Sequence, residues 1–134
     1  MQFKECYQNP FIEERADPYI TLGPDGFYYF TASYPMKSAD DKDGYDRVIL
    51  RRAKDISELA SAEEITIWKV ADTTLTHRFI WAPELHYIAG RWYVFYAGSE
   101  DKENNWAFDC HVLVCDSDDP YTGTWSEKGK FQKR

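Results

Sequence analysis

The stretch IWAPELHYIAGRWYVFYAG, residues 80–98, decides the fold of this chain. A polar, aromatic-rich opening leads into one β-prone run, a tight turn at residues 89–91 and a second β-prone run. Two such runs around a short glycine-containing turn are typical of a β-hairpin. The stretch ADPYITLGPDGFYYFTAS, residues 16–33, has the same order of features. Two copies of one β unit predict a repeat architecture, because self-similar segments indicate stacked or radial repeats.

An alignment of the two copies without a gap places Ala82 on Asp17 and residues 92–95 on residues 27–30. Positions that are alike in both copies are expected to be scaffold, because both units need the same packing. Positions that differ at the opening of the first strand are functional candidates, since one unit can be built without them. Asp17, Trp81 and Glu84 belong to this second group.

The rest of the chain completes the two units. The further β-prone runs are residues 48–50, 65–70, 111–114 and 124–126. Units of four short antiparallel strands in tandem are typical of β-propeller blades, so we predict an all-β fold with one blade at about 17–70 and another at about 82–134. Since a propeller needs at least about four blades to close, we expect an incomplete propeller that further blades complete, in cis or from a second chain.

Composition excludes several classes of partner. The chain has 134 residues, 16 basic against 23 acidic, and a formal net charge of -7. Without a basic run, nucleic acid and anionic membranes are poor partners, and no apolar run of about 18 residues predicts a membrane span. The chain has an odd number of cysteines, Cys6, Cys110 and Cys115, and residues 1–20 lack a signal-peptide pattern. This favours a cytoplasmic location, with secretion of a processed form as the alternative.

Asp17 is the first candidate site residue. It precedes Pro18, and a proline biases the preceding residue toward an extended backbone. We expect this to hold the Asp17 carboxylate at the inner rim of the first blade. The alternative is that Asp-Pro only starts a turn, but Ala82 at the equivalent position favours a functional role.

Aromatic and polar residues of the second unit are candidate sugar-binding groups. Trp81 offers a flat apolar face on which a sugar ring can stack, and Glu84 can accept hydrogen bonds from sugar hydroxyls. Packing between blades and a solvated glutamate are the alternatives. Trp106, in a polar loop, is either a further platform or a loop anchor, and His86 either contacts substrate or is structural. We expect no metal site, because Cys110, His111 and Cys115 lack a fourth ligand.

Three segments together resemble glycoside hydrolase family 43: Ala16-Asp17-Pro18, Trp81-Ala82-Pro83-Glu84 and Pro120-Tyr121-Thr122-Gly123-Thr124-Trp125. The last two are most similar to the α-L-arabinofuranosidase-like members. The resemblance implies a five-bladed propeller that hydrolyses terminal α-L-arabinofuranosyl, or β-xylosyl, linkages of plant polysaccharides or oligosaccharides with inversion. It implies Asp17 as the general base, and Trp81 and Glu84 in the sugar pocket.

The same resemblance implies what the chain lacks. The general acid, a glutamate, and a further aspartate lie on later blades in the family, so both are expected beyond residue 134. No cofactor is implied, although a calcium ion on the axis of the full-length parent stays open. An inverting enzyme needs two carboxyl groups about 6.5–9.5 Å apart, so we expect this chain alone to be inactive or nearly so.

Three other interpretations stay open at this stage. The chain could be a non-catalytic carbohydrate-binding module that uses Trp81 and Trp106 as platforms. It could be a β-repeat module that associates with itself through open blade edges. A retaining, fructosidase-type propeller is the third, and the Trp-Ala-Pro-Glu context argues against it.

Overall fold

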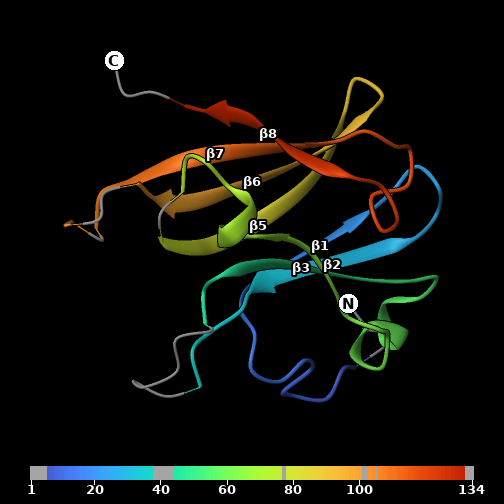
Figure 1. The fold of residues 1–134 in the computed structure, drawn as a ribbon. Helices are drawn as coiled ribbons and strands as arrows, with labels where there is room; N and C mark the ends of the chain where they lie inside the picture. Colours follow the sequence, from blue (N-terminus) through green and yellow to red (C-terminus); the bar gives the residue numbers. More distant parts are fainter. Residues whose placement is uncertain (1–5, 38–43, 77, 101–102, 105, 132–134) are drawn as a thin grey trace.

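The computed structural model describes residues 6–37, 44–76, 78–100, 103–104 and 106–131 (Figure 1). Within them the chain forms two four-stranded antiparallel sheets, with the strands in sequence order. The first sheet contains β1 (Ala16–Leu22), β2 (Tyr28–Ser33), β3 (Arg47–Ala53) and β4 (Ile65–Lys69). The second contains β5 (Arg78–Ile88), β6 (Arg91–Ser99), β7 (Phe108–Cys115) and β8 (Trp125–Lys130). The prediction of an all-β chain with two four-stranded units is confirmed.

Short 3-10 helices connect some of the strands: η1 (Ile56–Ala60) and η2 (Val70–Asp72). An Asp55 side-chain oxygen caps η1 by accepting a hydrogen bond from the Ser57 N–H at 2.8 Å. In the part of the chain that the structure describes, no helix is long and apolar enough to cross a membrane.

The strands follow from alternation in the sequence. Along β6, Trp92, Val94 and Tyr96 are buried while the residues between them are half-buried, as a two-residue period requires. The β5–β6 hairpin closes through Ala89 and Gly90, which both have positive φ (50° and 82°). Two-residue hairpin turns use positive φ because their twist then matches that of the strands.

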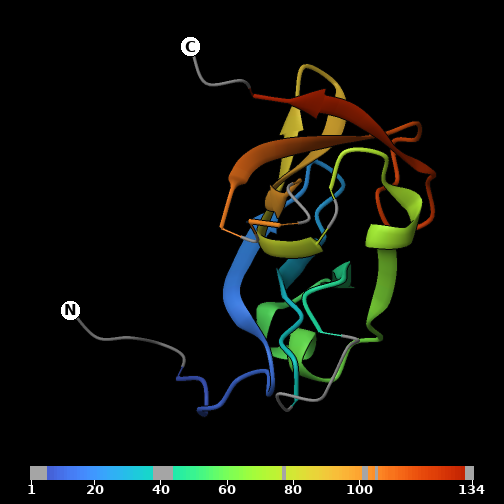
Figure 2. The same ribbon diagram turned by 60° about the vertical axis from the view of Figure 1, so that its left-hand side comes forward.

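The two sheets pack face to face, one above the other in Figure 1 and again in the rotated view of Figure 2. Tyr29 of the first sheet meets Trp92 of the second, with ring centroids 5.1 Å apart in an edge-on arrangement. Apolar residues of both sheets surround this contact and form one buried cluster: Val48, Leu50, Trp68, Ile80, Leu85, Val94, Tyr96 and Leu113. The main core therefore lies between the repeats and holds them together.

The far face of the first sheet carries a second, smaller cluster. Phe30, Ala32 and Ile49 are buried there together with Leu59 of η1. The lead-in before β1 contributes Phe11 to the packing of this cluster. This segment and η1 thus cover a face that would otherwise be apolar and open to water.

The alignment of the two repeats without a gap is wrong in its second half. Tyr19 pairs with Thr31 in the first sheet, and the equivalent Glu84 pairs with Phe95 in the second. Thr31 therefore corresponds to Phe95, whereas the alignment without a gap placed it on Tyr96. The tight β5–β6 turn is the cause, because it is one residue shorter than the connection from Leu22 to Tyr28. A one-residue slip exchanges the two faces of a strand, so the correct register decides which side chains are equivalent.

With the corrected register, Tyr93 is the counterpart of Tyr29. Tyr29 faces the second sheet, and Tyr93 lies on the outer face of that sheet, beside a hollow of about 330 Å³. Aromatic and aliphatic side chains line this hollow, among them Ile88, Phe95, Val112 and Phe131. The outer face of the second sheet is thus equivalent to the face with which the first sheet packs on its neighbour.

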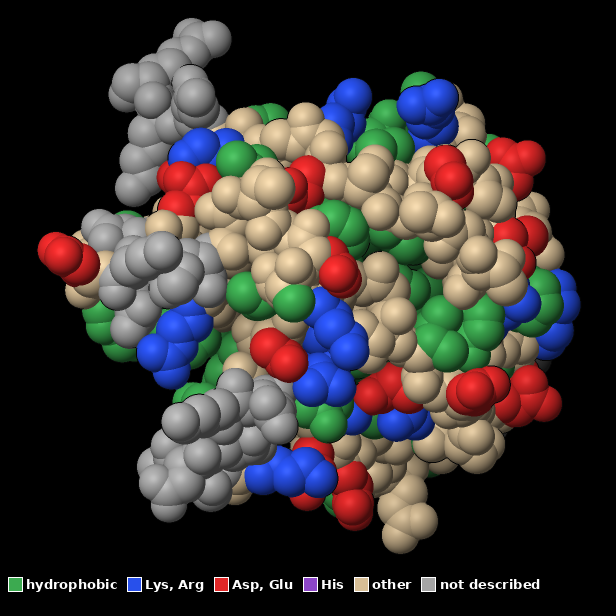
Figure 3. Space-filling model, in the orientation of Figure 1, with side chains coloured by type: hydrophobic (Ala, Val, Ile, Leu, Met, Phe, Trp, Pro, Cys, Tyr) green, Lys and Arg blue, Asp and Glu red, His purple; other side chains and the backbone are tan. Residues whose placement is uncertain are grey.

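Surface charges are mixed on the face that Figure 3 shows. Basic and acidic side chains alternate across its described part and do not gather into one basic patch. Several of these charges are paired, as in the contact between Arg52 and Asp119 at 2.9 Å. Although burial acts to raise it, the pKa of the Asp119 carboxyl is lowered by hydrogen bonds from the Tyr121 N–H and from Arg52.

We expect Trp92→Ala to destabilise the chain by about 3–5 kcal/mol, because it opens a cavity in the core between the sheets. Trp92 is 1% exposed, and its indole N–H donates a hydrogen bond to the Asp118 carbonyl at 2.9 Å. Trp106→Ala is the matched control: Trp106 is 79% exposed, so the change is expected to stay within about 0.5 kcal/mol. Urea unfolding followed by circular dichroism measures both, and equal effects would contradict the packing described above.

Candidate functional site

The candidate site begins at a β-bulge in β1. Ala16 pairs with Ser33 and Tyr19 pairs with Thr31, so β1 has one additional residue between these pairs. Asp17 lies in this bulge with φ at 50°. The prediction of an extended backbone at Asp17 is therefore wrong, because the bulge outweighs the bias of the following proline. Aspartate is among the residues that tolerate positive φ, and bulges re-aim side chains next to active sites.

The second repeat contains the same bulge. Between the pairs Trp81–Ala97 and Glu84–Phe95, β5 also has one additional residue, and Ala82 has φ at 45°. Ala82 thus matches Asp17 in sequence position, in backbone conformation and in the proline that follows. The two bulges differ in the side chain: one presents a carboxylate and the other a methyl group.

A buried serine joins the two bulges. Ser33 Oγ donates a hydrogen bond to Asp17 Oδ2 at 3.0 Å and accepts one from the backbone N–H of Ala82 at 2.7 Å. Ser33 is fully buried, whereas Asp17 and Ala82 are exposed. The carboxylate is therefore held on its buried side by Ser33 and is open to solvent on its other side.

Trp81, the neighbour of Ala82, belongs to an aromatic cluster. Phe108 stacks on its ring, with centroids 4.3 Å apart and planes at 22°. Phe79 and Tyr45 approach at 5.3 Å and 5.7 Å. Its indole nitrogen is buried without a hydrogen-bond partner among the described residues. This geometry favours the packing interpretation of Trp81 over that of a free sugar platform.

Trp106 is the exposed member of the same cluster. Its ring lies edge-on to Trp81, with centroids 6.0 Å apart, and 79% of the residue is exposed. The backbone N–H of Trp106 donates a hydrogen bond to Asn104 Oδ1 at 3.1 Å. The structure therefore brings Trp106 to Trp81, beside the bulge that Ser33 joins to Asp17.

Glu84 and His86 form a pair further along β5. Glu84 Oε2 lies 2.9 Å from His86 Nε2, as expected for neighbours on one face of a strand. The His86 ring also contacts Tyr19 of β1 at 5.3 Å and Phe95 of β6 at 5.5 Å. These contacts orient His86 where β1 and β5 lie side by side, and they leave Glu84 exposed.

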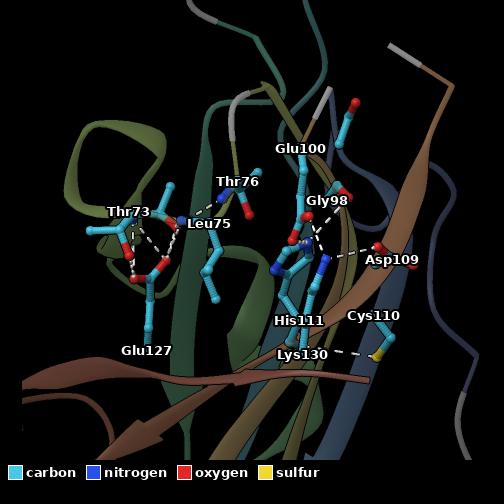
Figure 4. A network of polar contacts seen from close by, with 12 residues as sticks. Thr73, Leu75, Thr76, Gly98, Glu100, Asp109, Cys110, His111, Glu127 and Lys130 are labelled. Atoms are coloured by element: carbon cyan, nitrogen blue, oxygen red, sulfur yellow. Dashed lines mark hydrogen bonds and ion pairs between the residues drawn. The ribbon is translucent and has the colours of Figure 1, made fainter. Parts of the chain in front are cut away.

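A separate polar network lies at one end of the second sheet (Figure 4). Lys130 of β8 contacts the carboxylates of Asp109, at 3.2 Å, and of Glu100. His111 lies beneath them, 1% exposed and stacked on Tyr96 with centroids 5.2 Å apart. Its Nε2 lies 3.2 Å from the Gly98 carbonyl oxygen, and its Nδ1 is buried without a partner among the described residues.

Burial lowers the pKa of His111, and this effect outweighs the opposing effect of Glu100. The ring is therefore neutral in the folded protein near pH 7, which suits a buried imidazole with an unpaired nitrogen. The network contains no sugar-platform residue, and we interpret it as structural.

Another carboxylate of Figure 4 fastens the connection between the two sheets. Glu127 of β8 accepts hydrogen bonds from the backbone N–H groups of Thr74 and Leu75, at 3.0 Å and 3.2 Å. The Thr73 hydroxyl donates to the same carboxylate. This segment precedes β5, so Glu127 helps to fix where the second repeat begins.

Among the described residues, no group of three or more His, Cys, Asp or Glu side chains is arranged to hold a metal ion. Cys110 is exposed and Cys115 is buried, and both are free thiols. Burial raises the pKa of the Cys115 thiol.

Residues 7–134 match the family model described as Glycosyl hydrolases family 43. The chain belongs to glycosyl hydrolase family 43. It is 43% identical over 126 residues to an extracellular exo-alpha-(1->5)-L-arabinofuranosidase of Streptomyces chartreusis, covering 94% of this chain and 36% of that protein. It is 42% identical over 126 residues to alpha-L-arabinofuranosidase 43 of Humicola insolens, covering 94% of this chain and 24% of the relative.

Solved structures agree with this membership. The crystal structure of an alpha-L-arabinofuranosidase from Lactobacillus brevis has a TM-score of 0.78 and 40% identity, and the match covers 94% of this chain and 39% of that one. A family 43 enzyme from Xanthomonas citri, 20% identical with a TM-score of 0.66, shares the fold. The two sheets are thus blades of a family 43 propeller. The chain spans roughly a quarter to two fifths of the length of these relatives.

Sequence reasoning missed one residue of the candidate site in this family 43 chain. Ser33 lies at the end of β2, and the alignment without a gap hid its counterpart. In the corrected register Ser33 corresponds to Ala97, which pairs with Trp81 as Ser33 pairs with Ala16. The first repeat thus has Asp17 with Ser33 where the second has Ala82 with Ala97. The joint replacement of a polar pair by two alanines was the signal that could have found Ser33.

We expect the stability of the chain to rise with pH through the titration range of His111. The pKa of His111 is lowered in the folded state, so the unfolded chain takes up the proton first as the pH falls through its ordinary value near 6.5. The free energy of unfolding is then highest above about pH 6.5 and falls below it.

Urea midpoints measured from about pH 7.5 to 5 check this expectation, with His111→Gln reducing the slope. His86→Gln is the control, because that ring lies at the surface between β1 and β5. An equal slope in the wild type and in His111→Gln would exclude His111 as the source.

Proposed function

We propose that this chain supplies the first two blades of an inverting α-L-arabinofuranosidase and that Asp17 is its general base. One observation carries the proposal: an exposed carboxylate sits on a strained bulge whose twin in the second repeat carries only a methyl group. Non-glycine residues at positive φ cluster at active sites, where the surrounding structure maintains the strain. The names of the relatives that are more than 40% identical support the substrate class.

In the proposed reaction, Asp17 takes a proton from a water molecule while the water oxygen attacks the anomeric carbon of the sugar. The bond to the leaving oxygen breaks, and a general acid protonates that oxygen, so the configuration is inverted. Glu100 and Asp109 both contact Lys130, in the network that we interpret as structural. We assign the general acid to a later blade of the full-length protein, as the family resemblance implies.

The arabinose-containing end of an oligosaccharide is the proposed ligand, with a xylose-containing one as the alternative. Trp106 offers the exposed aromatic face, and apolar faces of sugar rings stack on such surfaces. Glu84 and His86 lie on the same inner strand as Ala82 and can bond to sugar hydroxyls. Trp81 supports Trp106 from behind through its edge-on contact.

Further blades are the proposed partner of the second sheet. Its outer face, with Tyr93, Phe95 and Val112, is equivalent to the inner face of the first sheet, where a blade already packs. A repeat that continues in the same sense places the next blade there and buries this apolar surface. A non-catalytic, self-associating module is the second candidate function, because the same face would also pair with another copy.

Secretion is the proposed location of the full-length protein. The Streptomyces relatives, at 43% identity, are named as extracellular enzymes. These names favour secretion over the cytoplasmic location that the odd number of cysteines suggested.

We expect Asp17→Asn in the full-length protein to lower kcat on an aryl α-L-arabinofuranoside by about 10²–10⁴-fold, because the amide cannot take a proton from water. Asp72→Asn is the control, since Asp72 lies in η2 and caps the Lys69 N–H. Proton NMR of the first-formed sugar should show the inverted anomer. Wild-type turnover in Asp17→Asn, or turnover by the 134-residue chain alone at normal enzyme rates, would contradict the proposal.

We expect Trp106→Ala in the full-length protein to raise KM by about tenfold with a small change in kcat, because stacking stabilises bound substrate and transition state alike. Steady-state kinetics with an arabino-oligosaccharide measures the two constants. Trp106→Phe, which keeps an aromatic face, should retain most of the affinity. If Trp106→Ala leaves KM unchanged, Trp106 is a loop anchor only.

A further inference from the structure

We propose that Ser33 is a positioning residue that makes the orientation of the Asp17 carboxylate depend on the docking of the second sheet. The inference rests on the proposed role of Asp17 as general base. It assigns to the second blade, through one backbone N–H group, a part in holding a catalytic group of the first blade.

The direction of both hydrogen bonds at Ser33 is fixed. A backbone N–H can only donate, so Ser33 Oγ accepts the bond from Ala82 through a lone pair, at 2.7 Å. The hydroxyl has one proton, which goes to Asp17 Oδ2 at 3.0 Å. Neither bond can be reversed, and the carboxylate is always the acceptor.

Burial of Ser33 protects its two hydrogen bonds from competition by water. Ser33 has no exposed surface, so water cannot replace either of its partners without disturbing the packing between the sheets. Asp17 is exposed on its other side. Ser33 holds Oδ2, which leaves the second carboxylate oxygen of Asp17 available to an attacking water molecule. A base held in this way loses little orientational freedom when the reaction begins.

The second repeat shows that the bulge does not need this hydrogen bond. Ala82 adopts the same positive φ as Asp17 although its side chain accepts nothing, and its neighbour across the sheet in the Ser33 position is Ala97. The Asp17–Ser33 contact is therefore not required to fold a bulge of this kind. A role in orienting the carboxylate explains why the polar pair occurs in one repeat only.

The link also reaches the aromatic cluster. Ala82 follows Trp81, whose ring is fixed by Phe108 at 4.3 Å. A displacement of this part of β5 moves the Ala82 N–H and with it the partner of Ser33. Asp17 is thus linked to Trp81 through Ser33 and Ala82. Two hydrogen bonds join the Asp17 carboxylate to the Ala82 N–H, and a peptide bond joins Ala82 to Trp81.

The kinetic experiment uses the full-length protein. Ser33→Ala is expected to lower kcat about 10- to 100-fold with little change in KM, the range for one hydrogen bond to a charged group. Ser33→Thr keeps the hydroxyl and should recover much of the loss. The matched control is Thr31→Val: Thr31 lies two residues away on the same face of β2, is also buried, and donates to the Ile49 carbonyl at 2.7 Å. It should lower stability without lowering kcat.

A double variant separates this inference from the proposed function. In the Asp17→Asn background, Ser33→Ala should cause no further loss of kcat, because its effect acts through Asp17. If Asp17→Asn alone keeps wild-type turnover, the proposed function is wrong. If Asp17→Asn is inactive while Ser33→Ala retains full kcat, or the two losses simply multiply, only the positioning role is wrong.

Hydrogen exchange of the Ala82 amide tests the link without activity, on the 134-residue chain. Ser33→Ala should accelerate exchange at Ala82 by about tenfold or more relative to other amides of β5, since the acceptor is removed. Thr31→Val should leave that ratio unchanged. An unchanged Ala82 ratio in Ser33→Ala would overturn the hydrogen bond on which the inference depends.

Discussion

The packing of the two sheets against each other is the interaction on which the rest of the structure depends. The largest buried cluster lies between the repeats, around the contact of Tyr29 with Trp92. A single four-stranded sheet has two faces to cover and cannot form a dry core alone. Each blade is therefore stable only against its neighbours. This dependence also brings the starts of β1 and β5 together, and the candidate site lies at that junction.

The two repeats share the backbone of the candidate site and differ in the side chains that it carries. Both repeats bend their first strand with a bulge and hold a residue at positive φ, at Asp17 and at Ala82. Such a conformation costs on the order of 1–3 kcal/mol and persists only where the surrounding structure maintains it. Because the core between the sheets maintains both bulges, the side chain at each is free to differ. The bulge of the first repeat carries the Asp17 carboxylate, and Ser33 lies beside it as its hydrogen-bond partner.

The sequence predicted the class of fold and the main candidate residue because those properties depend on local patterns. Alternation, turn residues and the repeat indicated eight short strands, and the contrast of Asp17 with Ala82 indicated Asp17 as the candidate base. Which residues of β2 and β6 are equivalent in the two repeats could not be obtained in this way. It depends on the length of a turn, and an alignment without a gap passes over a one-residue difference between two loops. The φ of Asp17 was missed for a similar reason, since a bulge is a property of paired strands and not of the dipeptide.

Trp81 shows a different limit of sequence reasoning. A tryptophan in a Trp-Ala-Pro-Glu turn has the same identity whether its face is open or covered. The face of Trp81 is occupied by Phe108, which arrives from β7 and is distant in sequence. The exposed ring is instead that of Trp106, which sequence reasoning left between a sugar platform and a loop anchor. Only the tertiary packing shows that the ring of Trp81 is covered and that the ring of Trp106 is exposed.

The division of the site between blades has a consequence for what this chain retains. The groups that orient Asp17 are the Ser33 hydroxyl and the Ala82 N–H, and both lie within the two sheets described here. In the proposed mechanism, preorganisation of Asp17 therefore does not require any other blade. Protonation of the leaving oxygen does, because no geometry of one carboxylate can serve as acid and base on opposite sides of a sugar. In the proposed mechanism, these two blades supply the base, and closure of the propeller adds the general acid.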